Sequence, residues 1–238
     1  MPVNINKSDV IFLIRAYNEA TRIWSVIDEV MAHGYRKILV VNDGSRDHTE
    51  EVVRAYPNVI YIAHPQNRWA GAALETGFEF LRRNAEAIEV RYVVTFDADG
   101  QHSIDDMPKF LEAFAQNPDL DIVFGSRFIT KTESNVPFFR RIILWGGKWF
   151  TWAISGIRLT DAHNGYRMHS ISAIRQITLT MDGMEYASEI IEQVRIHHLK
   201  FSEVPVNILY DDYTMAKGQR HGGAIRIAVM IIWKKFFS

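Results

Sequence analysis

The chain has no cysteine among its 238 residues. This excludes disulfide bonds, zinc–thiolate sites and thiol nucleophiles, and it permits a reducing compartment. Neither sign of charge is in excess, because the formal net charge is -1, so a nucleic acid partner is not indicated. No apolar run reaches the roughly 18 residues that a membrane-spanning helix needs. The first nine residues are polar and do not have the pattern of a signal peptide.

The composition is that of an ordinary globular protein, with 47% hydrophobic and 23% charged residues. Short apolar runs alternate with helical patterns through the first half. This alternation indicates an α/β fold with a mostly parallel central sheet and helices on both faces. The expected strands cover residues 10–14, 37–41, 59–63, 92–96 and 121–125. The expected helices cover residues 19–33, 47–56, 69–84 and 104–116.

The second half of the chain is less regular. Residues 136–157, which are rich in aromatic and basic side chains, and the apolar pattern of 186–199 predict two further helices. Residues 201–210 alternate and contain Pro205, which predicts an edge strand. No linker divides the chain, so we expect a single domain over residues 1–223.

A separate segment, residues 224–238, is apolar, aromatic and basic. This composition suits a helix that lies in a membrane interface. A final helix packed on the core, or one side of a homodimer contact, would have a similar pattern. All three interpretations stay open.

The most informative stretch holds two carboxylates one residue apart, Asp97 and Asp99, directly after an apolar run. In an extended segment, side chains two residues apart point the same way, so the two acids can converge on one cation. Two carboxylates with few other protein ligands suit Mg²⁺ or Mn²⁺, which keep positions open for phosphate oxygens. A simple turn at the end of the strand is the alternative.

Three expected strands end in polar residues: 15–19, 42–47 and the pair Asp97 and Asp99. In open parallel sheets, ligands bind beyond the carboxyl ends of the strands. The sheet would bring all three ends to one edge. Their agreement indicates a site for a diphosphate.

Three motifs carry this pattern along the chain in order. They are Tyr17-Asn18-Glu19, Asn42-Asp43-Gly44-Ser45-x-Asp47-x-Thr49 and Asp97-Ala98-Asp99-Gly100-Gln101-His102. The set resembles family 2 glycosyltransferases with the GT-A fold, and within them the dolichyl-phosphate mannose synthase group and its bacterial polyprenyl-phosphate or polysaccharide relatives. Further matches are Gly71-x-Ala73-x-x-x-Gly77, Gly125-Ser126-Arg127-Phe128, Asp161-x-x-x-Gly165-Tyr166-Arg167, Glu203-Val204-Pro205-Val206 and Lys217-Gly218-Gln219.

The resemblance implies roles for several residues on the donor side. Asp97, Asp99 and Gln101 would hold the metal and the diphosphate, with Asp99 counted among the catalytic residues. The expected nucleotide-pocket residues are Ala16, Tyr17, Asn18, Glu19 and Asp43. The alternatives are that Asn18 and Glu19 only begin a helix and that Asp43 only forms a turn.

Basic residues would bind the phosphates. Arg127, Lys217 and Arg220 are candidates for the diphosphate, with a solvated basic loop as the alternative for Arg220. Arg140 and Arg141 resemble the phosphate-binding helix of the polyprenyl-phosphate branch.

The acceptor side rests on fewer residues. Asp161 is a candidate general base for an acceptor hydroxyl, or it braces the following turn. A phosphate acceptor needs no base, so Asp161 discriminates between the two kinds of acceptor. We interpret Glu189 as an exposed helix carboxylate. Departures from the family pattern are Leu144 and Trp145, where a small hydroxyl residue is usual, and Trp69, where a glycine is usual.

The nine histidines do not suggest a metal site. His197 and His198 are adjacent, so on a helix they do not face one site. His163, His169 and His221 show no ligand spacing, and we interpret them as surface or hydrogen-bonding residues.

The sequence thus predicts an inverting, metal-dependent glycosyltransferase that uses a UDP- or GDP-type nucleoside diphosphate sugar. The expected acceptor is polyprenyl phosphate or a polyprenyl-linked glycan, at the cytoplasmic face of the membrane. A nucleotidyltransferase would usually carry a glycine-rich loop after the first strand, and residues 15–19 contain no glycine. A catalytically silent sugar-nucleotide binder is the other alternative.

Overall fold

The computed structural model describes residues 5–129 and 156–209. The strands in this range are β1 (Val10–Ala16), β2 (Lys37–Asn42), β3 (Ile60–Ala63), β4 (Tyr92–Asp97), β5 (Ile122–Ser126), β6 (Arg167–Ser170) and β7 (Phe201–Pro205). The α-helices are α1 (Ile23–Ala32), α2 (Thr49–Arg54), α3 (Trp69–Asn84), α4 (Met107–Gln116), α6 (Ile171–Gln176) and α7 (Tyr186–Ile196).

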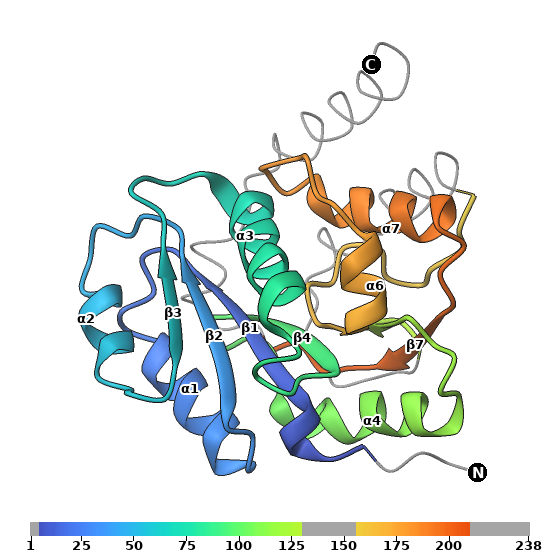
Figure 1. Cartoon of the computed structure of the whole chain (residues 1–238), viewed down its shortest axis with the longest axis horizontal. Helices are drawn as coiled ribbons and strands as arrows, with labels where there is room; N and C mark the ends of the chain where they lie inside the picture. The colour runs from blue at the N-terminus through green and yellow to red at the C-terminus, as the bar shows by residue number, and fades with distance from the viewer. Residues whose placement is uncertain (1–4, 130–155, 210–238) are drawn as a thin grey trace.

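One sheet of seven strands forms the centre of the molecule, in the order β3-β2-β1-β4-β6-β5-β7 (Figure 1). Neighbouring strands of this sheet run parallel, except that β6 is antiparallel to both β4 and β5. Because β6 runs the other way, the segment that precedes it arrives at the edge where β4 and β5 end. The fold thus collects chain segments from both halves of the sequence at one edge of the sheet.

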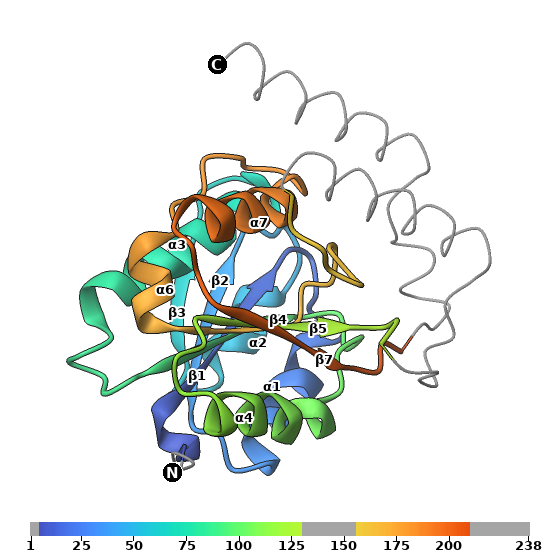
Figure 2. The ribbon, with the colours of Figure 1, turned by 90° about the vertical axis from the view of Figure 1, so that its right-hand side faces the viewer.

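Helices cover both faces of this sheet, with α1, α2 and α4 on one side and α3, α6 and α7 on the other (Figure 2). Alternate residues of β1 serve the two layers: Phe12 and Ile14 belong to the α1/α4 core, whereas Ile11 and Leu13 belong to the α3/α7 core. A strand buried on both faces must be apolar at every position, which explains its continuous hydrophobic run.

The α/β fold with a mostly parallel sheet is confirmed, and α3 has the bounds expected from the sequence. The first helix begins later than expected, at Ile23, because residues 19–22 form a turn in which the Glu19 carbonyl accepts from the Arg22 N–H. The edge strand is confirmed as β7, although it ends at Pro205.

The short strand β6 and helix α6 were not expected from the sequence. The helix expected over 136–157 lies outside the described residues, except for its last two, which are not helical. Within residues 5–129 and 156–209, none of the helices combines the length and the hydropathy that are required to span a membrane.

Candidate functional site

The carboxyl ends of β1, β2 and β4 lie side by side, as the sequence predicts. Ala16 at the end of β1 pairs with Asn42 at the end of β2, and Arg15 pairs with Asp97 at the end of β4. The register therefore brings the motifs that follow these three strands together at one edge. The two carboxylates of the third motif lie on the β4 side of this edge, and Asp43 lies on the β2 side.

Asp97 is held by two neighbours that the sequence analysis did not assign. The Arg15 guanidinium forms an ion pair with its carboxylate and also stacks on the Tyr186 ring, 4.9 Å from the ring centroid. Burial alone would raise the pKa of Asp97, but the charge and the hydrogen bond of Arg15 outweigh it and lower that pKa. Asp97 is therefore a permanent negative charge at the end of β4.

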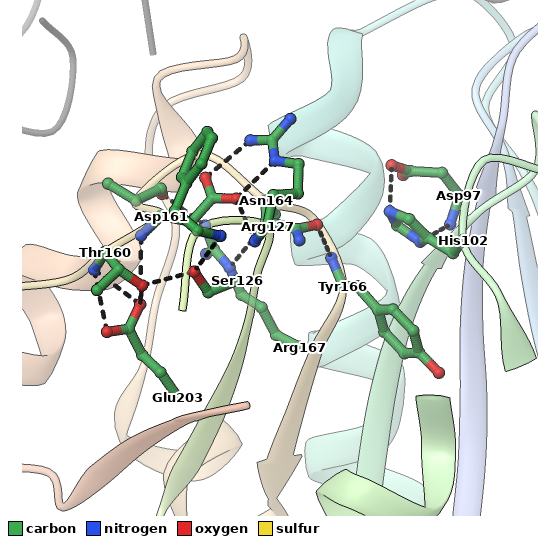
Figure 3. Close-up of polar contacts among 12 residues, drawn as sticks. Asp97, His102, Ser126, Arg127, Thr160, Asp161, Asn164, Tyr166, Arg167 and Glu203 are labelled. Carbon is green, nitrogen blue, oxygen red and sulfur yellow. Dashed lines mark hydrogen bonds and ion pairs between the residues drawn. The ribbon is translucent and has the colours of Figure 1, made fainter. Parts of the chain in front are cut away.

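His102 lies against Asp97 from the other side (Figure 3). Its Nδ1 accepts from the Asp97 backbone N–H at 3.3 Å, which leaves the proton on Nε2, 3.6 Å from Asp97 Oδ2. The ring stacks on Tyr166 with centroids 5.0 Å apart. Burial lowers the pKa of His102 to about 4, so the ring is neutral and acts as a positioning group.

Asp99 has the opposite electrostatic environment. Burial, the neighbouring Asp97 charge and the Glu19 charge raise its pKa to about 7, although the Gln101 backbone N–H donates to Oδ1 at 3.0 Å. The Gln101 side-chain amide is buried, and its Nε2 finds no partner among the described residues. Two clustered carboxylates fit a divalent cation, which would relieve the repulsion between them.

The described residues contain no group of three or more acidic, histidine or cysteine side chains that could hold a metal by themselves. Asp97 and Asp99 thus form a two-carboxylate donor set. Such a set suits a cation that takes its other ligands from water and substrate oxygens, as Mg²⁺ does in phosphate chemistry.

Asp43, on the β2 side, is buried and fixed. Its Oδ1 accepts from the His64 ring at 2.7 Å and from the Arg68 N–H at 2.8 Å. The other ring nitrogen of His64 lies 2.8 Å from the Thr76 hydroxyl on α3. Asp43 thus connects the end of β2 to the loop between β3 and α3, and it forms more than a local turn.

The loop after β1 holds the other predicted nucleotide residues. Asn18 has a positive φ of 54°, and it is bonded to the loop after β2: its N–H donates to Ser45 Oγ and its Oδ1 accepts from the Arg46 N–H. Ala16 is buried at the end of the strand, Glu19 is buried, and Tyr17 is exposed. Asn18 therefore joins two loops, and Tyr17 is presented to solvent beside them.

Arg127 and Asp161 form a buried ion pair at the end of β5 (Figure 3). The guanidinium Nε and Nη2 donate to the two Asp161 oxygens at 2.6 and 2.7 Å, and the Arg127 N–H adds a third bond at 3.2 Å. Burial would raise the pKa of Asp161, but Arg127 lowers it. The two residues, predicted separately for donor and acceptor, are brought together as one unit.

Glu203 on β7 holds the segment that carries Asp161. Its carboxylate accepts from the Thr160 N–H and hydroxyl and from the Asp161 N–H, at 2.8 to 3.2 Å. The Thr160 hydroxyl also lies 2.5 Å from Ser126 Oγ at the end of β5. Strands β5 and β7 therefore fix the position of the Arg127–Asp161 pair.

Two sequence interpretations are corrected here. Glu189 is buried, not exposed, and its carboxylate accepts from the Thr180 and Met181 N–H groups, so it holds the loop before α7. His169 lies fully inside the core, and neither ring nitrogen has a hydrogen-bond partner within residues 5–129 and 156–209. It is therefore neither a surface nor a hydrogen-bonding residue.

Several predicted site residues lie outside the described residues: Arg140, Arg141, Lys217 and Arg220. The same holds for Leu144, Trp145, His221 and the segment 224–238. Conversely, Arg15, His64 and Glu203 are structural partners of site residues that sequence reasoning did not assign. Arg15 lies in the polar segment 15–19 and Glu203 in the motif Glu203-Val204-Pro205-Val206, but their partners are far away in the chain.

Comparison with known proteins shows the family of this chain. The family model described as "Glycosyl transferase family 2" matches residues 11–178. A UDP-N-acetylglucosamine–dolichyl-phosphate N-acetylglucosaminyltransferase of Methanococcus voltae is 30% identical over 96% of this chain and 93% of its own length. A polyprenol monophosphomannose synthase of Mycolicibacterium smegmatis is 28% identical over 91% of this chain and 83% of its own.

Solved structures resemble the fold as well. A glucosyl-3-phosphoglycerate synthase of Mycobacterium tuberculosis, crystallised with Mn²⁺, uridine diphosphate and phosphoglyceric acid, superposes with a TM-score of 0.66 at 14% identity. The match covers 94% of this chain and 77% of that one. The GT-A fold expected from the sequence is confirmed. Since the family model covers more than half of the chain, this protein belongs to glycosyl transferase family 2 and is a glycosyltransferase.

Proposed function

We propose that this glycosyltransferase transfers a sugar, with inversion, from a UDP- or GDP-type nucleoside diphosphate to a polyprenyl-linked acceptor in cell-surface glycan synthesis. The observation that carries the proposal is the position of Asp97 and Asp99 close to Glu19, at the same edge of the sheet as Asp43. The named functions of the M. voltae and M. smegmatis relatives support a lipid-phosphate acceptor.

On the donor side, Asp97, Asp99 and Gln101 would hold Mg²⁺ or Mn²⁺. When bound, the cation neutralises the charge that develops on the departing diphosphate. The protein contributes the placement: Arg15 and His102 fix the Asp97 carboxylate, and the Gln101 N–H orients Asp99. Asp43, on the β2 side, would contact the nucleoside. Arg127, Lys217 and Arg220 remain candidates for phosphate contacts.

The state of Asp161 favours a phosphate acceptor over a sugar hydroxyl. A general base needs a free carboxylate with a pKa near the working pH, whereas both Asp161 oxygens are bonded to Arg127 and its pKa is lowered. A phosphate oxygen of polyprenyl phosphate is already anionic. It can bond to the anomeric carbon while the bond from that carbon to the diphosphate breaks, and no proton has to be removed.

The remaining parts of the proposal concern the membrane. A lipid-linked acceptor requires the enzyme to reach a bilayer, and the basic, aromatic composition of 224–238 suits peripheral contact at the cytoplasmic face. Arg140 and Arg141 would bind the acceptor phosphate. A homodimer through the same C-terminal segment is the competing proposal, and sedimentation of the full chain with and without vesicles separates the two.

The test is transfer of labelled sugar from a panel of UDP- and GDP-sugars to polyprenyl phosphate by the full chain with Mn²⁺ or Mg²⁺. We expect an organic-soluble product with at least one donor, and none with Asp99→Asn. Product that needs an added glycan acceptor would contradict the lipid-phosphate proposal. Donor binding without transfer or hydrolysis would indicate the silent binder, and formation of a sugar nucleotide would indicate a nucleotidyltransferase.

A further inference from the structure

Trp69, the first residue of α3, has an unusual conformation. Its φ is +75°, in the left-handed region that glycine adopts freely and that bulky side chains rarely adopt. The side chain is 67% exposed, and within the described residues the indole makes no hydrogen bond or ring contact. The largest side chain therefore occupies a position that the backbone favours for the smallest.

The fold imposes this conformation from both sides. The Arg68 N–H is bound to Asp43 at 2.8 Å, and the Trp69 N–H is bound to Asn67 Oδ1 at 3.1 Å. After Trp69, the Gly71 N–H donates to the Asp182 carbonyl at 2.6 Å. With the backbone fixed, strain at Trp69 is a cost that an exposed ring does not repay by burial. We infer that a contact between the indole ring and a ligand offsets this strain.

The order of the strands indicates what that is. Asp97 and Asp99 follow β4, Asp43 follows β2, and Trp69 follows β3, in a sheet ordered β3-β2-β1-β4. Neighbouring strands are about 4.8 Å apart, so β2 lies about 10 Å from β4. A nucleoside diphosphate with its diphosphate at Asp97 and Asp99 would extend its ribose toward Asp43 and its base toward Trp69.

We propose that the indole of Trp69 stacks on the nucleobase of the donor and thereby contributes to donor affinity. The proposal rests on the function proposed above, because it takes the donor to be a nucleotide lying along this edge. A flat, exposed indole offers a π-face to any base, and base–aromatic stacking is a substantial, sequence-tolerant contribution to binding. The backbone strain is the cost of holding the ring in place.

The experiment compares Trp69→Gly and Trp69→Ala with the wild-type full chain. Binding of UDP, GDP, dTDP and inorganic pyrophosphate is measured by calorimetry with Mn²⁺, and the melting temperature is measured without ligand. Trp69→Gly removes both the ring and the strain, so we expect a rise in melting temperature of about 2–4 °C and about tenfold weaker nucleotide binding. Trp69→Ala keeps the strain, so nucleotide binding should weaken equally without that rise. Pyrophosphate binding should be unchanged in both.

The matched control is Glu89→Gly. Glu89 is also exposed with a positive φ, 51°, but it lies before β4, at the opposite edge of the sheet. This variant should melt higher and bind nucleotide as the wild type does. Equal nucleotide affinity in wild type and Trp69→Ala would overturn the stacking proposal and leave the proposed function unaffected. The same conclusion would hold if Trp69→Ala bound lipid vesicles less well than the wild type does. Failure of the wild type to bind any of the nucleotides would overturn the proposed function and this inference with it.

Discussion

His169 gives the sharpest test of the electrostatics of this fold. The residue lies on β6, fully buried, with its ring edge-on to Phe78 at a centroid distance of 5.5 Å. Both ring nitrogens lack a partner in the described part of the structure. Burial, with a smaller contribution from the Arg167 charge, lowers the pKa of His169 to about 3. The ring is therefore neutral in the folded protein at any pH at which the enzyme could work.

Replacing His169 by leucine, which has a similar volume, should stabilise the protein in two ways. An unpaired buried polar group costs about 1–3 kcal/mol, and this cost disappears. In addition, the unfolded chain binds a proton at His169 below its usual pKa of about 6.5, which the folded chain does not do until about pH 3. In the wild type, the contribution of the neutral His169 ring to the free energy of unfolding is therefore fully present above about pH 6.5. Below that pH it falls by about 1.4 kcal/mol per pH unit.

The two contributions separate when pH is varied. At pH 7.5 the variant should exceed the wild type by about 1–3 kcal/mol in the free energy of unfolding. At pH 4.5, about two units below the unfolded pKa, the difference should grow by about 3 kcal/mol. Urea unfolding followed by circular dichroism at both pH values measures it. Acid sensitivity from His102 and His163, whose pKa values burial lowers to about 4, remains in both proteins and cancels.

The control is the same substitution at an exposed histidine, His197→Leu at the end of α7. It should change stability by no more than about 0.5 kcal/mol. A difference between His169→Leu and wild type that is the same at both pH values would refute the assignment of a neutral buried ring. A loss of stability at pH 7.5 would show that a ring nitrogen has a partner whose bond matters.

Three further predictions follow from the site and its support. Because the pKa of Asp99 is about 7, Mn²⁺ affinity should rise about tenfold per pH unit below 7 and level off above it, and Asp99→Asn should remove this dependence in a calorimetric titration. If Asp161 positions Arg127, Asp161→Asn should keep part of kcat without a shifted pH profile, whereas Asp161→Ala should lose at least about tenfold. Gly71→Ala should cost about 1–3 kcal/mol in urea unfolding, since a Cβ there would lie 2.0 Å from the Met181 carbonyl oxygen.

The sheet and the edge that carries the site could be predicted because both depend on local patterns. Continuous apolar runs specify strands that are buried on both faces, and the polar residues directly after them must lie at the carboxyl edge. Asp43, Asp97 and Asp99 were placed correctly by this reasoning alone. The short strand β6 was missed because its four residues, Arg167–Ser170, have a polar sequence and are too few to show a period.

The pairing of site residues could not be predicted, because it joins segments distant in the chain. Asp161 lies 34 residues from Arg127 and 42 from Glu203, and only the antiparallel entry into β6 brings them to the end of β5. The sequence therefore shows that Asp161 is acidic but does not show which residue it pairs with. Its candidacy as a general base followed from its type and place, whereas its bonds to Arg127 follow from the topology.

The same limit explains the two acids of the central motif. In sequence, Asp97 and Asp99 are equivalent carboxylates at alternate positions. In the fold, Asp97 faces Arg15, which lowers its pKa, whereas Asp99 faces Asp97 and Glu19, which raise its pKa to about 7. One acid is thus a fixed charge, whereas the other titrates near neutral pH. Since Arg15 lies on β1 and Glu19 in the loop after it, this asymmetry exists only when β1 and β4 are paired.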